Sequence, residues 1–403
     1  MRSLPRREFL SISVASSVLV LADTLRTRPT ARAVADSLDW LSPARPDIVA
    51  TYRAAPTEID LAGTVVSTWA YNDMVPGPLL RATAGDVVEV KVDNAFDEAT
   101  SIHWHGLAIV NSMDGVPGLT QADIDPRTQF TYRFAVPDSG TYWFHPHHGL
   151  QLDHGLYAPL IIDGRDDDVD VHVEYVIVLD DWLDGLGTTP EQELERIRDM
   201  GAAMGGPGHD MGDMEMATSP LLGGDAGDAV YPFHLVNGSP IDDPVTLDPQ
   251  PRGGDRLRLR FVNAGGDTAY RVAIGGHRMT VTHTDGFAIV PFEVDAFVIG
   301  MGERYDVTID IRSGVWPLVA LAEGKQARAA AVIRTRDAGA SPTPDLTADI
   351  DELDGVWLRY ADLRAAEDVA LTPPDVVDTR LITLTGGMVG FDWGFRWPAV
   401  RRS

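Results

Sequence analysis

Two pairs of histidines, His103 with His105 and His145 with His147, are spaced so that they could bind a metal ion together. Successive side chains of a β-strand point to opposite faces, so residues two apart share a face and each pair would project as a unit. The proline within the second pair predicts a strand end or edge, because proline cannot donate a hydrogen bond to a neighbouring strand. Two such pairs that face each other would offer four imidazole ligands to one centre.

Four imidazoles suit copper, zinc, iron or nickel, and copper stands highest among these ions in the general affinity order. We therefore expect a metal centre, with copper favoured. The seven other histidines lack a paired neighbour, and for each of them we expect an ordinary polar role: His148, His154, His172, His209, His234, His277 and His283.

A second candidate for metal binding is a run of five methionines set among glycine, histidine and aspartate residues: Met200, Met204, Met211, Met214 and Met216. Thioethers are soft ligands that select Cu(I). The same run is equally compatible with a surface loop whose first two methionines continue the apolar face of a preceding helix.

The composition limits the chemistry that the chain can perform. Its 403 residues carry a formal net charge of -27, so nucleic-acid backbones and anionic lipid surfaces would be repelled and cations attracted. The sequence contains no cysteine, so these residues offer neither disulfides nor a thiolate ligand for copper or zinc. The hydrophobic fraction of 44% and the charged fraction of 23% are typical of a globular protein.

The elements that must position these residues read as short strands. Val88, Val90 and Val92 alternate with charged residues, and the same period of two recurs at 130–134, 256–261 and 305–311. Glycine, proline and aspartate clusters separate the runs. This pattern predicts an all-β fold of sandwich type, in which each strand has an apolar and a polar face.

The strands also repeat as a set. Gly85-Asp86 followed by alternation to Asn94 is matched by Gly254-Asp255 followed by alternation to Asn263. We expect two related sandwiches, at 36–165 and 166–336, and a segment over 337–403 that begins with linker composition. The one predicted helix covers 190–200, where Thr189 and Gln192 can form a capping box.

The first 35 residues resemble a twin-arginine export signal. Arg6 and Arg7 precede an apolar run over 12–21, and Ala33-Val34-Ala35 offers a cleavage site of small residues. No other stretch reaches the roughly 18 apolar residues that a membrane span needs. We expect the folded protein to be exported by the twin-arginine translocase to the periplasm or the cell exterior, with no membrane span in its mature form.

Together these motifs resemble the multicopper oxidases. The family's first domain is matched at 71–78, 85–86, 101–106, 113–117, 140–147 and 155–162, and its second domain at 238, 263, 285–286 and 302–306. The resemblance implies tandem cupredoxin-like, or plastocyanin-like, Greek-key β-sandwiches with copper as the cofactor. It also implies a laccase-like or cuprous oxidase that passes electrons from a phenol or Cu(I) to dioxygen and releases water.

The resemblance assigns a role to each matching residue. His103 would be a ligand of the type 2 copper, and His105, His145 and His147 would be ligands of the type 3 pair. Asp114 matches the family's acidic residue that helps to move protons to dioxygen, although an Asp-Gly pair is also an ordinary turn.

The sequence departs from the family after the second domain. The family takes its remaining trinuclear ligands, and the thiolate of its type 1 copper, from a third domain, and only 386–394 resemble the entry to that domain. The second domain should be metal-silent, because apolar residues stand where the first has histidines: Val272, Ile274, Val319 and Leu321. The alternatives to an oxidase are a copper-sequestering protein without turnover, a scaffold, or the product of a truncated oxidase gene. A separate chain could also supply the third domain.

Overall fold

The computed structural model describes residues 45–164, 170–204, 217–372, 381–386 and 394–396, with 201–204 described by their backbone alone. All of its strands belong to one compact unit that begins at Ile48. The predicted export signal, Met211, Met214 and Met216 lie outside the described residues, as does 387–393.

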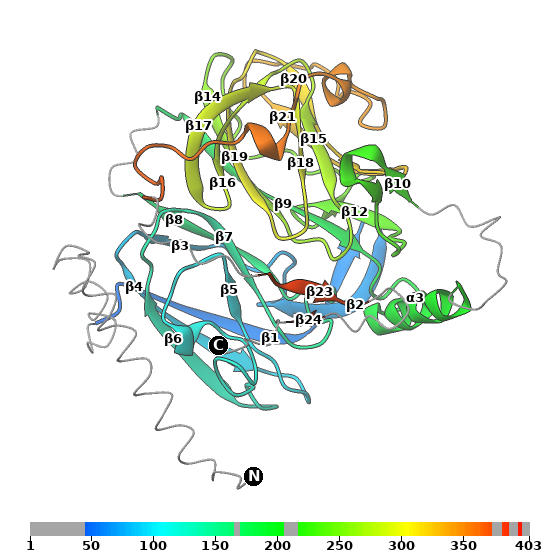
Figure 1. Ribbon diagram of the computed structural model, residues 1–403. Helices are drawn as coiled ribbons and strands as arrows, with labels where there is room; N and C mark the ends of the chain where they lie inside the picture. The colour runs from blue at the N-terminus through cyan, green and yellow to red at the C-terminus, as the bar shows by residue number, and fades with distance from the viewer. Residues whose placement is uncertain (1–44, 165–169, 205–216, 373–380, 387–393, 397–403) are drawn as a thin grey trace, which may run out of the picture. The chain divides into compact units, whose positions relative to one another are not determined.

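The first part of the chain forms a sandwich of two four-stranded sheets (Figure 1). One sheet has the order β2 (Thr64–Tyr71), β1 (Ile48–Leu61), β4 (Val87–Asn94) and β6 (Gln129–Ala135). The other has the order β3 (Leu80–Thr83), β8 (Ala158–Asp163), β7 (Gly140–His145) and β5 (His103–His105). Strand β1 pairs antiparallel with β2 and parallel with β4. Val88, Val90 and Val92 are fully buried, as their alternation predicts.

The second part forms a larger sandwich. Its seven-stranded sheet has the order β13 (Ser239–Pro240), β12 (Phe233–Val236), β9 (Val173–Trp182), β14 (Arg256–Asn263), β19 (Arg304–Asp310), β16 (Met279–Thr284) and β17 (Phe287–Val294). Its five-stranded sheet has the order β21 (Ala327–Arg334), β20 (Val315–Ala322), β15 (Tyr270–Ile274), β18 (Ala296–Ile299) and β22 (Trp357–Leu358). The predicted all-β fold is therefore confirmed, while the domain boundaries remain predictions.

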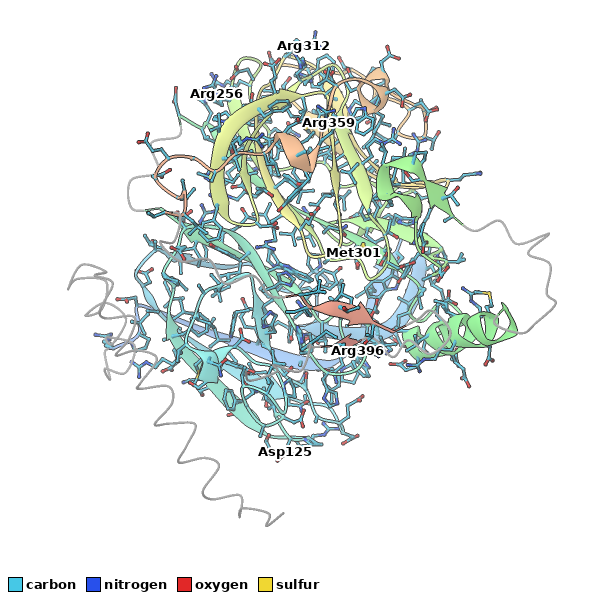
Figure 2. The ribbon with its side chains drawn as sticks, viewed as in Figure 1. Asp125, Arg256, Met301, Arg312, Arg359 and Arg396 are labelled. Atoms are coloured by element: carbon cyan, nitrogen blue, oxygen red, sulfur yellow. The ribbon has the colours of Figure 1, made fainter. Side chains whose placement is uncertain are left out.

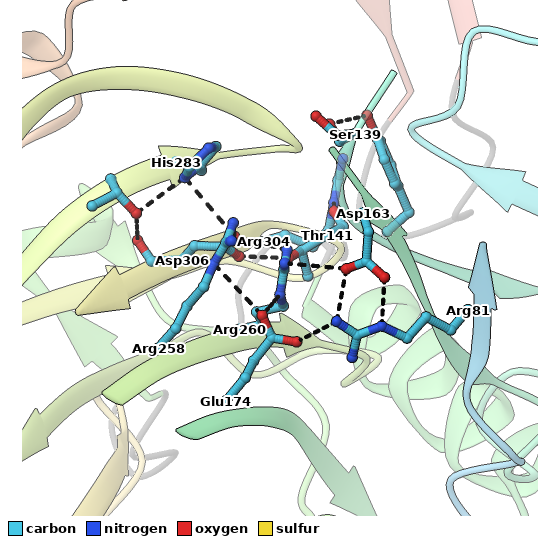
Figure 3. A network of polar contacts seen from close by, with 12 residues as sticks. Arg81, Ser139, Thr141, Asp163, Glu174, Arg258, Arg260, His283, Arg304 and Asp306 are labelled. Carbon is cyan, nitrogen blue, oxygen red and sulfur yellow. Dashed lines mark hydrogen bonds and ion pairs between the residues drawn. The ribbon is translucent and has the colours of Figure 1, made fainter. Parts of the chain in front are cut away.

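The polar face of β14 is covered in the structure, which the alternation alone does not predict. Leu257, Leu259 and Phe261 are buried as expected, but Arg258 and Arg260 on the other face are buried as well. That face is covered by strands of the first sandwich, since Arg260 Nη1 donates to Thr141 Oγ1 of β7 at 3.2 Å (Figure 3). A period of two predicts which side chains share a face, and it leaves open what covers that face.

The predicted helix is α3 (Pro190–Met204). The capping box is present, because Thr189 N donates to Gln192 Oε1 at 3.2 Å and Gln192 N donates to Thr189 Oγ1 at 3.3 Å. The helix continues four residues beyond the predicted end at 200, through Gly201 and two alanines that favour helix. Neither α3 nor any other helix of the described residues is long and apolar enough to cross a membrane.

Shorter elements complete the described chain. They are the hairpins β10 (Thr218–Ser219) with β11 (Gly224–Asp225) and β23 (Thr383–Thr385) with β24 (Gly394–Arg396), and the 3-10 turns η2 (Asn111–Met113), η3 (Pro220–Leu222), η4 (Asp351–Asp354) and η5 (Tyr360–Asp362).

Candidate metal centre

Strands β5 and β7 bring three of the four predicted histidines to one face. The two strands are antiparallel, with His103 opposite His145 and His105 opposite Trp143. The His103 ring centroid lies 5.8 Å from that of His105 and 5.7 Å from that of His145, and His105 and His145 are 5.4 Å apart. The predicted sharing of a face is therefore observed on β5.

Trp104 explains why the histidines of β5 point away from the core. Its indole is fully buried and packs against Tyr132, Phe134 and Phe144 at centroid distances of 5.5, 4.9 and 5.2 Å. Because alternate side chains of a strand face opposite ways, this anchor turns His103 and His105 to the outer side of the sheet.

The fourth histidine reaches the cluster from just beyond the end of β7. The His147 ring centroid lies 4.6 Å from that of His103 and 5.2 Å from that of His145. Its backbone N–H donates to Ser101 Oγ at 2.9 Å, which ties this turn to the segment that leads into β5. His145 is buried, whereas His147 is exposed, so the cluster has an inner and an outer side.

Backbone carbonyl groups fix two of the rings. His103 Nδ1 lies 2.8 Å from Asp114 O, and His145 Nδ1 lies 2.9 Å from Pro146 O. A ring nitrogen beside a carbonyl oxygen must carry the hydrogen, so Nε2 of each ring keeps its lone pair. Metal-binding histidines are oriented in this way by outer partners.

The environment keeps the inner rings neutral. Burial, followed by the charge of Arg304, lowers the pKa of His105 to about 3, and burial lowers the pKa of His145 to about 3. Burial and the neighbouring His103 also lower the pKa of His147. Neutral imidazole is the form that binds a metal, so these side chains are available as ligands at neutral pH.

The residues fit a copper centre after a local change. As the rings stand, no group of three or more His, Cys, Asp or Glu side chains of the described residues is placed to hold an ion. His105 Nδ1 and His145 Nε2 hydrogen-bond each other at 3.2 Å. Two nitrogens that bind one ion at about 2.0–2.1 Å lie about 3 Å apart, so an ion could replace the shared hydrogen with little movement.

Of the five methionines in the predicted segment, the structure describes the side chain of Met200 alone. Met200 Sδ accepts a hydrogen bond from Arg196 Nη1 at 2.9 Å on α3, and nothing is described of the Met204 side chain. In the second sandwich, Val272, Ile274 and Val319 are fully buried. Asp114 does reach the cluster, with Oδ1 3.5 Å from His103 Nδ1.

Two residues beside the cluster were not predicted as site residues from the sequence. Gly302 lies against the His105 ring, and Arg304 is buried close to the end of β5. Both belong to the segment 302–306, which contributed only to the resemblance. Strands far apart in sequence bring them to the histidines, so local spacing carries no signal of their position.

The unpaired histidines that are described each have a polar partner. His148 lies beside Asp123, His172 beside Arg256 N, His234 beside Tyr270 Oη, His277 beside Gly275 O, and His283 beside Thr282 Oγ1. His209 lies outside the described residues. These contacts agree with the ordinary polar roles that the sequence predicts.

His154 has the strongest set of partners and predicts a pH dependence. Its Nδ1 lies 2.8 Å from Asp184 Oδ2, and its Nε2 lies 3.1 Å from both carboxylate oxygens of Glu191. Burial works to lower the pKa of His154, but the hydrogen bonds and charges of these two carboxylates outweigh it and raise the pKa. Protonated His154 thus joins the first sandwich to the start of α3.

We expect His154→Gln to lower the melting temperature more at pH 6 than at pH 9. A raised folded-state pKa gives stability that is fully present below the ordinary value of 6.5 and is lost as the pH rises through the folded-state pKa. His234→Gln is a matched control, because His234 is equally buried but burial lowers its pKa to about 4. The loss in melting temperature caused by His234→Gln should not be larger at pH 6 than at pH 9. Equal pH trends in thermal denaturation of the two variants would contradict the expectation.

Comparison with known proteins connects this geometry to one family. Two family models, each described as multicopper oxidase, match residues 53–167 and 174–338. Multicopper oxidase MmcO of Mycobacterium tuberculosis is 43% identical over 399 residues, which cover 97% of this chain and 78% of that protein.

Less similar proteins also match this chain. A copper resistance protein A homolog of Pseudomonas syringae pv. tomato is 31% identical and covers 87% of this chain, but this chain spans only 60% of that protein. The crystal structure of Fet3p, described as a multicopper oxidase that functions in iron import, superposes with a TM-score of 0.63 over 84% of this chain and 61% of that one. At 23% identity this match supports the fold alone.

Proposed function

Because this chain belongs to the multicopper oxidase family, we propose that it is a copper-dependent oxidoreductase whose copper ligands include His103, His105, His145 and His147. The observation that carries the proposal is the meeting of four imidazoles at the edge formed by β5 and β7, where the ring centroids of contacting pairs lie 4.6 to 5.8 Å apart. Family membership implies copper as the cofactor.

The four histidines divide by position. We propose His103 as the type 2 ligand and His105, His145 and His147 as type 3 ligands. Carbonyl groups at Asp114 and Pro146 orient two of the rings, and burial keeps the inner rings unprotonated and ready to bind. When bound, copper supplies the redox chemistry that passes electrons to dioxygen.

Asp114 is the proposed proton carrier. Its carboxylate lies 3.5 Å from His103 Nδ1, and its side chain is 29% exposed. It therefore contacts both the cluster and solvent, as a group that moves protons from water toward dioxygen must do. Asp114 follows η2 directly, as its C-cap residue.

The source of electrons is proposed from the family, as a phenol or Cu(I). A type 1 copper needs a thiolate ligand, and these 403 residues contain no cysteine. We propose that any type 1 centre, and the ligands that complete the trinuclear cluster, come from residues outside this sequence. Copper sequestration without turnover is the outcome to expect if no such residues take part. The methionine segment at 200–216 remains a proposed Cu(I) site.

Titration of the purified protein with Cu(II) tests the proposal. We expect saturable binding and the electron paramagnetic resonance spectrum of copper with nitrogen ligands. Oxygen uptake with Cu(I) or a phenol as reductant then separates an oxidase from a sequestering protein. A preference for Zn²⁺ over Cu²⁺, or no binding of copper, would contradict the assignment.

We also propose export by the twin-arginine route, which rests on the first 35 residues alone. Replacement of Arg6 and Arg7 by lysine should leave the protein in the cytoplasm, because the translocase reads the paired arginines. Fractionation and immunoblotting of cells that express the two forms measures this. Unchanged export of the double-lysine form would show that another signal is used.

A further inference from the structure

A turn of the second sandwich lies directly against a proposed copper ligand. The turn covers 300–303, and Met301, labelled in Figure 2, belongs to it. Gly302 has a φ of +78°, and a Cβ added there would lie 2.9 Å from Cε1 and 3.3 Å from Nε2 of His105. The backbone of the second sandwich thus forms a wall beside the histidine cluster.

Arg304 connects this wall to both strands that carry the ligands. Its Nη1 donates to Gly302 O at 2.8 Å, and its Nε donates to Thr141 O of β7 at 3.2 Å. A side chain on Gly106, the residue after His105, would collide with Arg304 Nη2. One guanidinium therefore contacts the turn, the end of β5 and the strand that carries His145.

The same stretch of β7 is held by a second set of buried charges. Thr141 Oγ1 donates to Asp306 Oδ1 at 2.5 Å, and Arg258 Nη2 donates to Asp306 Oδ2 at 2.6 Å (Figure 3). This set contacts β7 four residues before His145 and touches neither Gly302 nor Gly106. It anchors the strand, whereas Arg304 also contacts the residues around His105.

Burial of the charged Arg304 guanidinium is energetically unfavourable, so its hydrogen bonds must require an arginine at this position. Its side chain is 5% exposed, and its carboxylate partner among the described residues, Asp285 at 3.1 Å, is 44% exposed. A buried ion pair is poor evidence of stability, since well-packed apolar residues often replace both partners together without loss. The planar guanidinium of arginine donates hydrogen bonds in several fixed directions. Neither an apolar side chain nor lysine can do this.

We propose that Arg304 is a positioning residue for the copper centre, which holds the 300–303 wall and the ends of β5 and β7 so that His105 faces His145. The proposal rests on the proposed function, in which these histidines bind copper. It assigns the second sandwich, whose sequence has no paired histidines, a part in building the centre.

The test compares Arg304→Met with Arg258→Met. Both arginines have side chains that are 5% exposed, and both are bonded to buried partners, but only Arg304 contacts the residues around His105. We expect Arg304→Met to weaken Cu(II) affinity by about 10- to 100-fold and to change its electron paramagnetic resonance spectrum, as loss of an outer partner does at metal sites. Arg258→Met should lower stability while keeping the copper spectrum.

Arg304→Lys keeps the charge and loses the fork, so it should show the same spectral change if Arg304→Met does not fold. Histidine side-chain nitrogen resonances of the metal-free proteins give a readout that does not depend on copper. The His105 signals should shift in the Arg304 variants and stay in place in Arg258→Met. Unshifted His105 signals would overturn the positioning role, whereas shifted signals in a protein that binds no copper would overturn only the proposed function.

Discussion

The double variant His103→Ala and His105→Ala should bind Cu(II) at least two orders of magnitude more weakly than the unchanged protein. Loss of a single outer partner already costs about 10- to 100-fold at metal sites, and this change removes two of four proposed ligands. Both rings lie on the outer face of β5, while Trp104 holds the strand in the core, so the fold should survive. Copper retained after dialysis, measured by mass spectrometry, gives the result.

The matched control for this variant replaces His148 and His172 by alanine. These two histidines have their own partners, Asp123 and the backbone of Arg256, and are absent from the ring contacts of the cluster. Their loss should leave copper content unchanged. Equal copper in the two double variants would mean that the metal binds elsewhere, and the methionine segment would then be the next site to test.

Gly115→Ala should both destabilise the protein and disturb the copper site. Gly115 has a φ of +81°, and a Cβ added there would collide with Ile102 O, directly before β5. Left-handed strain and forced displacement each cost about 1–3 kcal/mol, so we expect a loss of roughly 2–6 kcal/mol in the free energy of unfolding. The shift would also move Asp114 O away from His103 Nδ1, which frees that ring to rotate.

The variant Gly118→Ala separates the effect of backbone strain from the effect of the collision with Ile102. Gly118 lies in the same loop with a φ of +72°, but nothing lies within 4 Å of an added Cβ. This variant keeps the backbone strain without the collision, so its loss should stay near the lower end of about 1–3 kcal/mol, and its copper affinity should be normal. Similar losses in both variants, measured by denaturant unfolding, would show that contact with Ile102 is unimportant.

Local patterns in the sequence were enough to predict the strands, the start of the helix and the histidine pairs. The period of two at Val88, Val90 and Val92 predicts their burial, and the same period places His103 and His105 on one face of β5. Thr189 and Gln192 predict the start of α3 through bonds that span three residues. Each of these features depends on residues within one strand or one turn. Such residues are close in the sequence, so the sequence alone can predict the feature.

Only the tertiary structure decided how these elements meet. The pattern of β14 predicts a polar arginine face, yet Arg258 and Arg260 are buried because strands of the first sandwich cover it. The Arg304 bond to Thr141 joins residues 163 positions apart, and the pairing of His103 with His145 sets which rings share the centre. Periodicity fixes the direction of a side chain relative to its own strand. Which surface it then meets depends on how strands distant in the sequence pack against one another.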